Sequence, residues 1–349
     1  SRDKNAYAVL RRYFGELWAF PTVIWSVDTL FRSGLIEHDR TWPSATARWR
    51  SSIRSTPMLI SDAPFIRIDD LLPTRSELVR LKDLNRRLVA YRDNDIIRKL
   101  RRDVRIQNEA LADLVVSLVS SRWQRTESGL LTNGKIVLNP LRACYYRVFN
   151  RDWYHGGRWY GPWWQGLSSR DRQCLTINGE PVVERDYRHI HPTLLAALNG
   201  FEFGGDDPYG IDGFVRSDVK RAFNVLINAD TERTAHYALQ KHFAQMNCSA
   251  SVRYARQLAE AVKQRHPKFS EAWGTGIGLR LQRIDAHMCA QVQQLMRDAG
   301  CPVLSIHDSF IAPVSHQGLL DEVMSRVLER VTGLLADGSR QKLNRCLIW

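Results

Sequence analysis

The acidic residue Asp186 stands where the sequence changes from a strand pattern to a helix pattern. The β-branched residues Val182 and Val183 precede it, and a run rich in Leu and Ala follows it and ends at Asn199-Gly200. This order predicts a buried strand, then Asp186, then a helix. A short carboxylate at a strand end is well placed to hold a divalent cation. The alternative is that Asp186 only caps or solvates the helix, because acidic residues are common at helix starts.

Two cations on a later predicted helix could bind phosphate groups. Residues 216–229 have a helical pattern in which Lys220 follows Arg216 by four residues. This spacing places both side chains on one face of a helix. A triphosphate needs several charge-assisted contacts, so the pair suits such a ligand. Ordinary surface charges are the alternative, because the same spacing occurs on many helices.

A second acidic residue, Asp308, lies at the tip of a predicted hairpin. Apolar residues on both sides of His307-Asp308 predict two short strands within residues 302–313. A helix is expected before the hairpin, over residues 279–298, and an amphipathic helix after it, over residues 319–335. The hairpin would therefore present one carboxylate at its turn.

The composition of the chain favours a polyanionic partner. Of 349 residues, 50 are Lys or Arg and 37 are Asp or Glu, which gives a net charge of +13. Such an excess favours nucleic acid, and the 11 Trp and 11 Tyr residues could provide stacking faces for bases. A merely basic protein with its aromatic residues in the core is the alternative. The 44% of apolar residues is enough for a sizeable hydrophobic core. The length of the chain suggests about two domains or one multi-lobed domain.

Other classes of protein fit the sequence poorly. The six cysteines are scattered and include no Cys-x-x-Cys pair, which argues against a zinc site and a disulfide framework. No apolar run approaches the roughly 18 residues of a membrane span, and the N-terminus is too polar for a signal peptide. We therefore expect a cytoplasmic location and no membrane partner.

The chain before residue 123 is expected to support the site. Residues 1–73 are mixed in character and are interpreted as a packing or docking region. Thr74 and Glu77 resemble a capping box, from which a basic helical stretch is expected to run over residues 74–122, kinked near Asn94. This stretch would be an arm that grips phosphates; a solvated helix face is the alternative.

Residues 123–182 are rich in turns and aromatic side chains. Asn133-Gly134 and Asn178-Gly179 predict hairpin turns. The segment Asp152–Trp164 combines glycines with one arginine among aromatic residues, a composition that suits a nucleic-acid surface. A tightly packed structural loop is the alternative.

Three segments, in chain order, resemble the motifs of one polymerase superfamily. Asp186–Leu198 resembles the first catalytic motif of the A-family DNA polymerases (DNA polymerase I type). Arg216-x-x-x-Lys220-Arg221 resembles the fingers-helix motif, and Ile306–Phe310 the third motif, both closest to the phage-type single-subunit RNA polymerases. Weaker resemblances lie in Asp152-Trp153 with Gly157–Tyr160, and in Gln282 with Asp285. The resemblance covers about residues 150–315, and the first 145 residues show no detailed match.

The resemblance implies nucleotidyl transfer assisted by two Mg²⁺ ions, for which Mn²⁺ could substitute. Asp186 and Asp308 would be the metal ligands, together with the main-chain carbonyl of Tyr187. Lys220 would contact the triphosphate and protonate the leaving pyrophosphate, while Arg216 would hold the terminal phosphate. The other nucleotide-binding residues would be His191, Asn224 and Asn228, and the residues near the primer and template would be Arg158, Gln282, His307 and Asp285.

Departures from the family pattern concern the choice of sugar. DNA polymerases of the family usually carry Glu five residues after the first Asp, the RNA polymerases carry Gly, and this chain carries His191. His191 is bulky enough to keep a gate against a ribose 2′-hydroxyl. Asn224, Asn228 and Ala229 also depart from the family residues of the fingers helix, and Ser309 replaces the Glu of DNA polymerases, as in the RNA polymerases.

The resemblance implies an α+β fold of the right-hand polymerase type, rich in helices and with an antiparallel palm sheet. The expected parts are the N-terminal region 1–73, a thumb-like arm 74–122, the first part of the palm 123–200, the fingers 201–278, and the second part of the palm with a C-terminal helix 279–349.

The function favoured by the resemblance is DNA synthesis from dNTPs on a primed DNA template, without proofreading. The runner-up is a DNA-templated RNA polymerase or primase that uses NTPs, and its product would be RNA. A third hypothesis is a nucleic-acid-binding protein with a degenerate, inactive palm.

Overall fold

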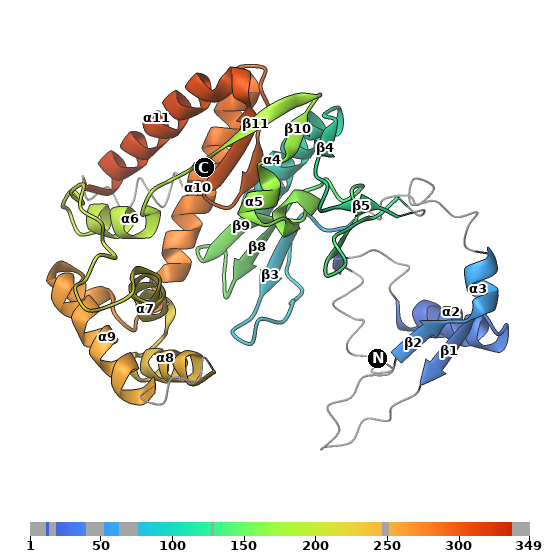
Figure 1. Ribbon diagram of the computed structural model, residues 1–349, viewed down its shortest axis with the longest axis horizontal. Helices are drawn as coiled ribbons and strands as arrows, with labels where there is room; N and C mark the ends of the chain where they lie inside the picture. Colours follow the sequence, from blue (N-terminus) through green and yellow to red (C-terminus); the bar gives the residue numbers. More distant parts are fainter. Residues whose placement is uncertain are drawn as a thin grey trace. The chain divides into compact units, whose positions relative to one another are not determined.

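The computed structural model describes residues 12–13, 19–39, 52–62, 76–126, 129–245 and 251–336 of the chain. The chain divides into two compact units, and Figure 1 labels most of their helices and strands. The first unit consists of Ser1–Arg147 and Tyr160–Val182, and the second of Val148–Trp159 and Val183–Trp349. Both units combine helices and antiparallel strands, as expected for an α+β fold. Within the described ranges, no helix combines the length and the apolar character that crossing a membrane requires.

In the N-terminal part of the first unit, the described residues include the helices α2 and α3 and a strand pair. α2 (Phe20–Arg32) has a proline in its first turn, where the missing N–H costs no hydrogen bond. β1 (Ile36–Asp39) pairs antiparallel with β2 (Ser52–Ser55), and α3 (Pro57–Asp62) follows. The interpretation of residues 1–73 as a packing or docking region stays a prediction.

The expectation of one helical stretch over residues 74–122 is wrong outside its middle part. β3 (Val79–Lys82) lies near the start, the helix α4 covers only Asp95–Ala112, and β4 (Val116–Leu118) follows. Apolar and basic residues alternate along β3, and Val79 is fully buried. A period of two places the apolar side chains on one face of a strand, so the cations here belong to a half-buried strand rather than a helix.

Asn94, where a kink was expected, is the true start of the helix. Its side-chain oxygen accepts a hydrogen bond from the backbone N–H of Ile97 at 2.9 Å, which is an N-cap contact. The carboxylate of Glu77, the expected capping partner, instead forms an ion pair with Arg101 of α4 at 2.9 Å. Thr74 lies outside the described residues.

Short strands dominate the rest of the first unit. The further elements are β5 (Gln124–Arg125), β6 (Leu131–Thr132), β7 (Val137–Leu138), β8 (Tyr146–Asn150), β9 (Gly156–Tyr160), the helices η4 (Trp163–Gly166) and α5 (Ser169–Arg172), β10 (Leu175–Ile177) and β11 (Glu180–Asp186). β5, β6 and β7 form one sheet, β3, β8 and β9 a second, and β4 and β10 extend a third that contains β11. Because the unit boundaries fall inside β8, β9 and β11, these strands contribute to both units. The turns predicted at Asn133-Gly134 and Asn178-Gly179 are confirmed, and their glycines have φ of +82° and +84°.

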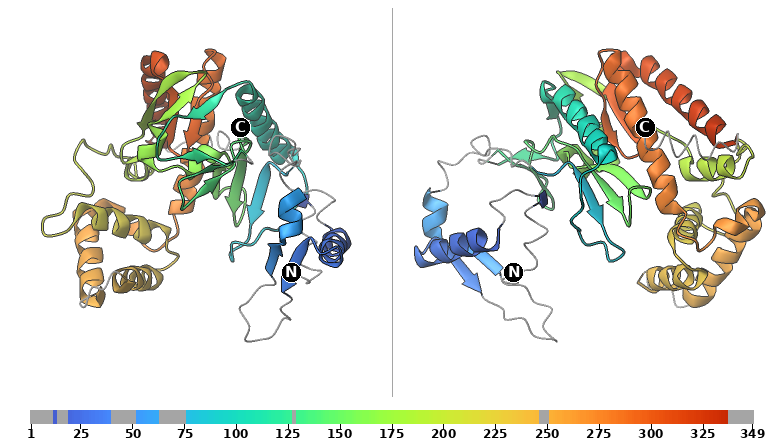
Figure 2. Two further views of the ribbon diagram at one scale, coloured as in Figure 1. Left: turned by 45° about the vertical axis from the view of Figure 1, so that its right-hand side comes forward. Right: turned by 180° about the vertical axis from the view of Figure 1, so that it is seen from behind.

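Helices pack around the end of β11 in the second unit. Its elements are α6 (Ile190–Leu198), α7 (Arg216–Asn228), α8 (Glu232–Gln245), α9 (Ser251–Arg265), η5 (Pro267–Ala272), α10 (Gly278–Asp298), β12 (Leu304–Ile306), β13 (Ser309–Pro313), η6 (Val314–His316) and α11 (Gln317–Ala336). β13 lies between β12 and β11 and is buried along its whole length. α6, α10 and α11 pack against one another, and α7, α8 and α9 form a second group of helices (Figures 1 and 2). The predicted helices and hairpin of this unit are confirmed.

Replacing the cap of α4 tests the corrected helix start. Asn94→Ala should lower the free energy of unfolding by about 1 kcal/mol, because the N–H of Ile97 loses its partner. Chemical denaturation followed by circular dichroism measures the change. Asn94→Ser should retain most of the stability, since serine caps about as well as asparagine. Equal stability of the alanine variant and the unaltered protein would contradict the assignment.

Candidate nucleotide and metal site

The end of β11 brings two acidic residues from distant parts of the sequence into one place. Asp186 is the last residue of β11, and the turn at His307-Asp308 leads into the neighbouring strand β13. The backbone N–H of Tyr187 donates to the carbonyl oxygen of Asp308 at 3.3 Å. α6 begins only at Ile190, after Asp186 and Tyr187, and has no side-chain cap. The alternative that Asp186 caps this helix is therefore wrong.

The side chain of Tyr187 anchors this junction to the core. It is buried, and its hydroxyl donates to the carbonyl oxygen of Met324 in α11 at 2.9 Å. Its ring meets Phe310 of β13 edge to face, with centroids 6.1 Å apart. Burial raises the pKa of Tyr187, so the hydroxyl stays protonated and keeps its role as donor. The residues on either side of Tyr187 are thereby held in position.

One pocket of about 510 Å³ contains most of the predicted site residues. The predicted residues that line it are Arg158, Asp186, Tyr187, His191, Arg216, Lys220, Asn224, Asn228, Gln282 and Asp308. His307 and Asp285 are not part of the lining. All of the lining residues belong to the second unit.

The donors at this junction suit a hard divalent cation. Asp186 and Asp308 both line this pocket, and the backbone of Tyr187 is hydrogen-bonded to that of Asp308. Among the residues that the structure describes, no cluster of three or more His, Cys, Asp or Glu side chains could hold a metal. A cation here would take its remaining ligands from main-chain carbonyl, substrate and water oxygens, as Mg²⁺ commonly does. The residues present therefore fit Mg²⁺ and do not fit a closed zinc site.

Two cations project from the first turns of α7 over an aromatic ring. The Arg216 guanidinium and the Lys220 ammonium lie 5.4 and 5.9 Å from the ring centroid of Tyr209. Arg216 also forms a two-point ion pair with Asp207, at 2.6 and 3.0 Å. This ion pair holds the pKa of Asp207 below its usual range. A phosphate that binds Arg216 must therefore compete with the Asp207 carboxylate.

A buried carboxylate holds two further residues of the pocket. Asp285 of α10 is only 2% exposed and forms an ion pair with Arg158 and a contact of 3.0 Å with Nε2 of His191. Burial alone would raise the pKa of Asp285, but the contacts with His191 and Arg158 outweigh it and lower the pKa. Asp285 acts on the pocket by positioning Arg158 and His191. The primer or template contact expected of Asp285 stays a prediction.

His307, the other predicted residue outside the lining, occupies a strained turn position. Its φ is +60°, in the left-handed region that side chains other than glycine seldom adopt. Burial and the nearby Arg158 charge lower the pKa of His307. A neutral imidazole in the turn next to Asp308 adds no positive charge beside the two carboxylates.

The two asparagines of α7 contact their surroundings closely. The side-chain amide of Asn228 donates to the carbonyl oxygen of Asn224 at 2.8 Å. A Cβ atom at Gly278, the first residue of α10, would lie 2.3 Å from the side-chain oxygen of Asn228. Glycine at position 278 therefore allows the start of α10 to pack against the end of α7. Asn228, the last residue of α7, lines the pocket.

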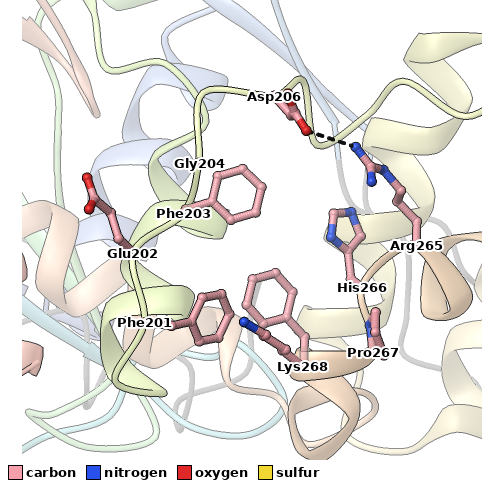
Figure 3. Close-up of a pocket in the computed structure, with 10 residues that line it drawn as sticks. Phe201, Glu202, Phe203, Gly204, Asp206, Arg265, His266, Pro267 and Lys268 are labelled. Atoms are coloured by element: carbon pink, nitrogen blue, oxygen red, sulfur yellow. Dashed lines mark ion pairs between the residues drawn. The ribbon is translucent and has the colours of Figure 1, made fainter.

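A cluster of aromatic rings holds the loop that carries Asp207 and Tyr209. Phe201 and Phe203 stack on the buried Phe269 with interplanar angles of 26° and 17°. The ring of His266 lies against the same cluster, and Nε2 of its neutral imidazole donates to the carbonyl oxygen of Pro208 at 2.8 Å. Figure 3 shows these side chains around a second pocket, of about 260 Å³. The cluster therefore fixes the loop immediately before Tyr209.

The aromatic segment Asp152–Trp164 is mostly structural. Trp159, Trp163 and Trp164 are all at least 95% buried, as the alternative interpretation of a packed loop predicts. The indole N–H of Trp159 donates to the carbonyl oxygen of Ala286 in α10 at 3.3 Å. Arg158 is the residue of this segment that lines the candidate site.

Four residues of the pocket were not identified from the sequence. They are Arg188, His189, Ile190 and Tyr209. The first three directly follow the Asp186-Tyr187 motif, so their proximity could have been anticipated. Tyr209 lies in a loop without periodic pattern, and only the tertiary packing brings it beneath Arg216 and Lys220.

Comparison with models of known protein families found no match, and comparison with curated proteins found none either.

The pKa of His266 predicts how stability depends on pH. Burial lowers this pKa from its ordinary value of about 6.5, so the unfolded chain binds a proton more readily than the folded protein. The free energy of unfolding should therefore fall as the pH drops from about 7.5 to about 5.5. His266→Gln keeps an N–H donor for Pro208 but does not titrate, so its stability should fall less over this interval. Urea unfolding followed by tryptophan fluorescence at both pH values measures the difference, and an equal fall in both proteins would contradict it.

Proposed function

We propose that this protein catalyses template-directed nucleotidyl transfer with Mg²⁺, and that it extends a primer with dNTPs. The observation that carries the proposal is the lining of a single pocket. Two acidic residues, Asp186 and Asp308, line the same pocket as the cationic residues Arg216 and Lys220 of α7. A metal-bound triphosphate requires both kinds of group, because its metal ions bind carboxylates and its phosphates bind cations.

The fold assignment is part of the proposal. The sheet β12-β13-β11 would serve as the palm, α7, α8 and α9 as the fingers, and the basic helix α4 as part of a thumb. The three motif-like segments of the second unit support this assignment, since each contributes residues to the same pocket. We therefore assign the chain to the superfamily of A-family DNA polymerases and phage-type RNA polymerases as a proposal.

The metal ions, held by Asp186 and Asp308, would supply activation of the attacking hydroxyl and neutralisation of phosphate charge. Arg216 would exchange its contact with Asp207 for one with the terminal phosphate. Lys220 would lie along the triphosphate and give a proton to the departing pyrophosphate. Most of the rate enhancement in such transfers comes from positioning and charge stabilisation, which these fixed groups can provide.

The choice of deoxyribose rests on His191. Its imidazole lines the pocket and is fixed by the buried carboxylate of Asp285. A side chain held in this way cannot move aside at low cost for an additional hydroxyl group. The fixed imidazole would exclude a ribose 2′-hydroxyl, and this favours dNTPs as the proposed substrates. RNA or primer synthesis from NTPs is the second candidate, favoured by the RNA-polymerase-like segments around Lys220 and Asp308.

A primer-extension assay tests the proposal. The full chain, with Mg²⁺ and either dNTPs or NTPs, is incubated with a primed and with an unprimed DNA template. We expect extension of the primed template with dNTPs. Products made from NTPs without a primer would replace the first candidate by the second. Retention of DNA without product under any condition would contradict both and leave a nucleic-acid-binding protein with a degenerate palm.

Variants link the activity to the pocket. Asp186→Asn and Asp308→Asn should each lower the extension rate about 10³-fold or more, with unchanged DNA binding in a gel-shift assay. Lys241→Ala, which removes an exposed cation of α8 outside the pocket, is the control and should extend normally. Normal extension by either Asp variant would disprove the metal assignment.

His191→Gly should accept NTPs more readily than the unaltered protein. An unchanged preference between dNTPs and NTPs in this variant would show that His191 does not select the sugar.

A further inference from the structure

A second binding site is indicated in the first unit, where a pocket of about 410 Å³ lies beside β7, β8 and η4. Its lining combines two tyrosines, an arginine and two side-chain amides with apolar groups. The polar lining residues are Asn139, Arg142, Tyr146, Tyr160 and Gln165. The volume is within the range of about 300–1,000 Å³ that is usual for sites of small ligands. None of these residues belongs to the candidate polymerase site.

Flat side chains are stacked at this pocket. The Arg80 guanidinium lies 3.5 Å from the ring centroid of Tyr146, and the rings of Tyr146 and Tyr160 stack at 6.3 Å with an interplanar angle of 27°. Gly161 makes the arrangement possible. A Cβ atom at this position would lie 2.3 Å from the carbonyl oxygen of Cys144 and 3.1 Å from the Tyr146 ring. The backbone at Gly161 thus allows Tyr146 and Tyr160 to line one cavity, with the Arg80 guanidinium on the Tyr146 ring.

The pocket is positively charged. Arg142 is its charged lining residue, no acidic residue lines it, and Arg142 forms no ion pair within the described part of the chain. Arg80 stands nearby, and its pKa is lowered, first by burial and also by the Arg142 charge. Two arginines close enough to repel each other attract an anion. The site therefore favours a ligand that carries both a flat ring and a negative charge.

Polar atoms at the edge of the ligand's flat ring would also find hydrogen-bonding partners in the pocket. The side-chain oxygen of Asn139 accepts a hydrogen bond from the backbone N–H of Leu141 at 2.9 Å, which turns its amide NH₂ to other acceptors. Gln165 also lines the pocket, and its side-chain oxygen accepts a hydrogen bond from the N–H of Gly161 at 3.0 Å. Side-chain amides of Asn and Gln can form hydrogen bonds with the edge of a nucleobase.

We propose that this pocket binds one nucleotide, with the base against the two tyrosines and the phosphate at Arg142. The nucleotide could be an unpaired residue of a nucleic-acid strand or a free mononucleotide, because both present the same base and phosphate. The net charge of +13 favours the strand. The proposal stands on the first unit alone and does not depend on the proposed polymerase activity.

Photochemical crosslinking locates the site directly. The full chain is irradiated with a single-stranded oligothymidylate that contains one 5-iodouracil, without divalent cation, and crosslinked peptides are identified by mass spectrometry. We expect the crosslink at Tyr146 or Tyr160. Competition by UMP would identify a free nucleotide as sufficient, whereas competition by unlabelled oligothymidylate alone would identify a strand. Either pattern supports the proposal, and crosslinks confined to the second unit would overturn it.

Matched variants separate stacking from folding. Tyr160→Ala and Arg142→Ala should each weaken binding of the oligonucleotide about tenfold, measured by fluorescence anisotropy. Tyr160→Phe keeps the ring and should bind normally, as should Tyr237→Ala, which removes an exposed tyrosine of α8. Equal affinity of Tyr160→Ala and the unaltered protein would overturn the proposal, and so would an equal loss in Tyr160→Phe and Tyr160→Ala.

Discussion

The candidate site depends on the placement of β13 beside β11. This neighbourhood brings Asp308 to Asp186 across more than a hundred residues of sequence, and the hydrogen bond from Tyr187 to the carbonyl oxygen of Asp308 joins the two strand ends. β13 can occupy this position because every residue of it is buried. Two carboxylates that would repel each other in isolation are therefore brought together at the ends of neighbouring elements of one sheet.

Around this edge, charged side chains form ion pairs. A ligand could displace one partner of such a pair or bind beside it. Arg216 is neutralised by Asp207 near the surface, where solvent and salt weaken the pair. Asp285, by contrast, is buried with Arg158 and His191, and removing one partner of such a buried group is costly. The Arg216–Asp207 pair could therefore be exchanged for a contact between Arg216 and a phosphate, whereas Asp285 holds the imidazole of His191 in a fixed position. The Arg216–Asp207 pair is thus exposed to solvent, whereas the contacts of Asp285 with Arg158 and His191 are largely shielded from it.

Much of the second unit could be predicted from the sequence because local patterns set its elements. The β-branched run before Asp186 and the turn at His307-Asp308 placed the two acids at strand ends, and the helical period of residues 216–229 placed Arg216 and Lys220 on one face. Long-range packing could not be predicted in this way. The burial of Asp285 and the position of Tyr209 depend on contacts between elements distant in sequence. Likewise, the cations of Val79–Lys82 conceal a short alternation of apolar and basic residues, so the sequence pattern predicts a helix where the structure has a strand.

Binding of Mn²⁺ measures most directly whether the two strand ends form one metal site. The loss of free Mn²⁺ signal in electron paramagnetic resonance, with dATP present, gives the affinity of the full chain. Asp186→Asn and Asp308→Asn should each weaken binding at least about tenfold, since each removes a charged oxygen ligand. Glu202→Gln, which neutralises an exposed acidic residue outside the candidate site, should bind as the unaltered protein does. Undiminished Mn²⁺ binding by both Asp variants would contradict a shared metal site at the ends of β11 and the hairpin.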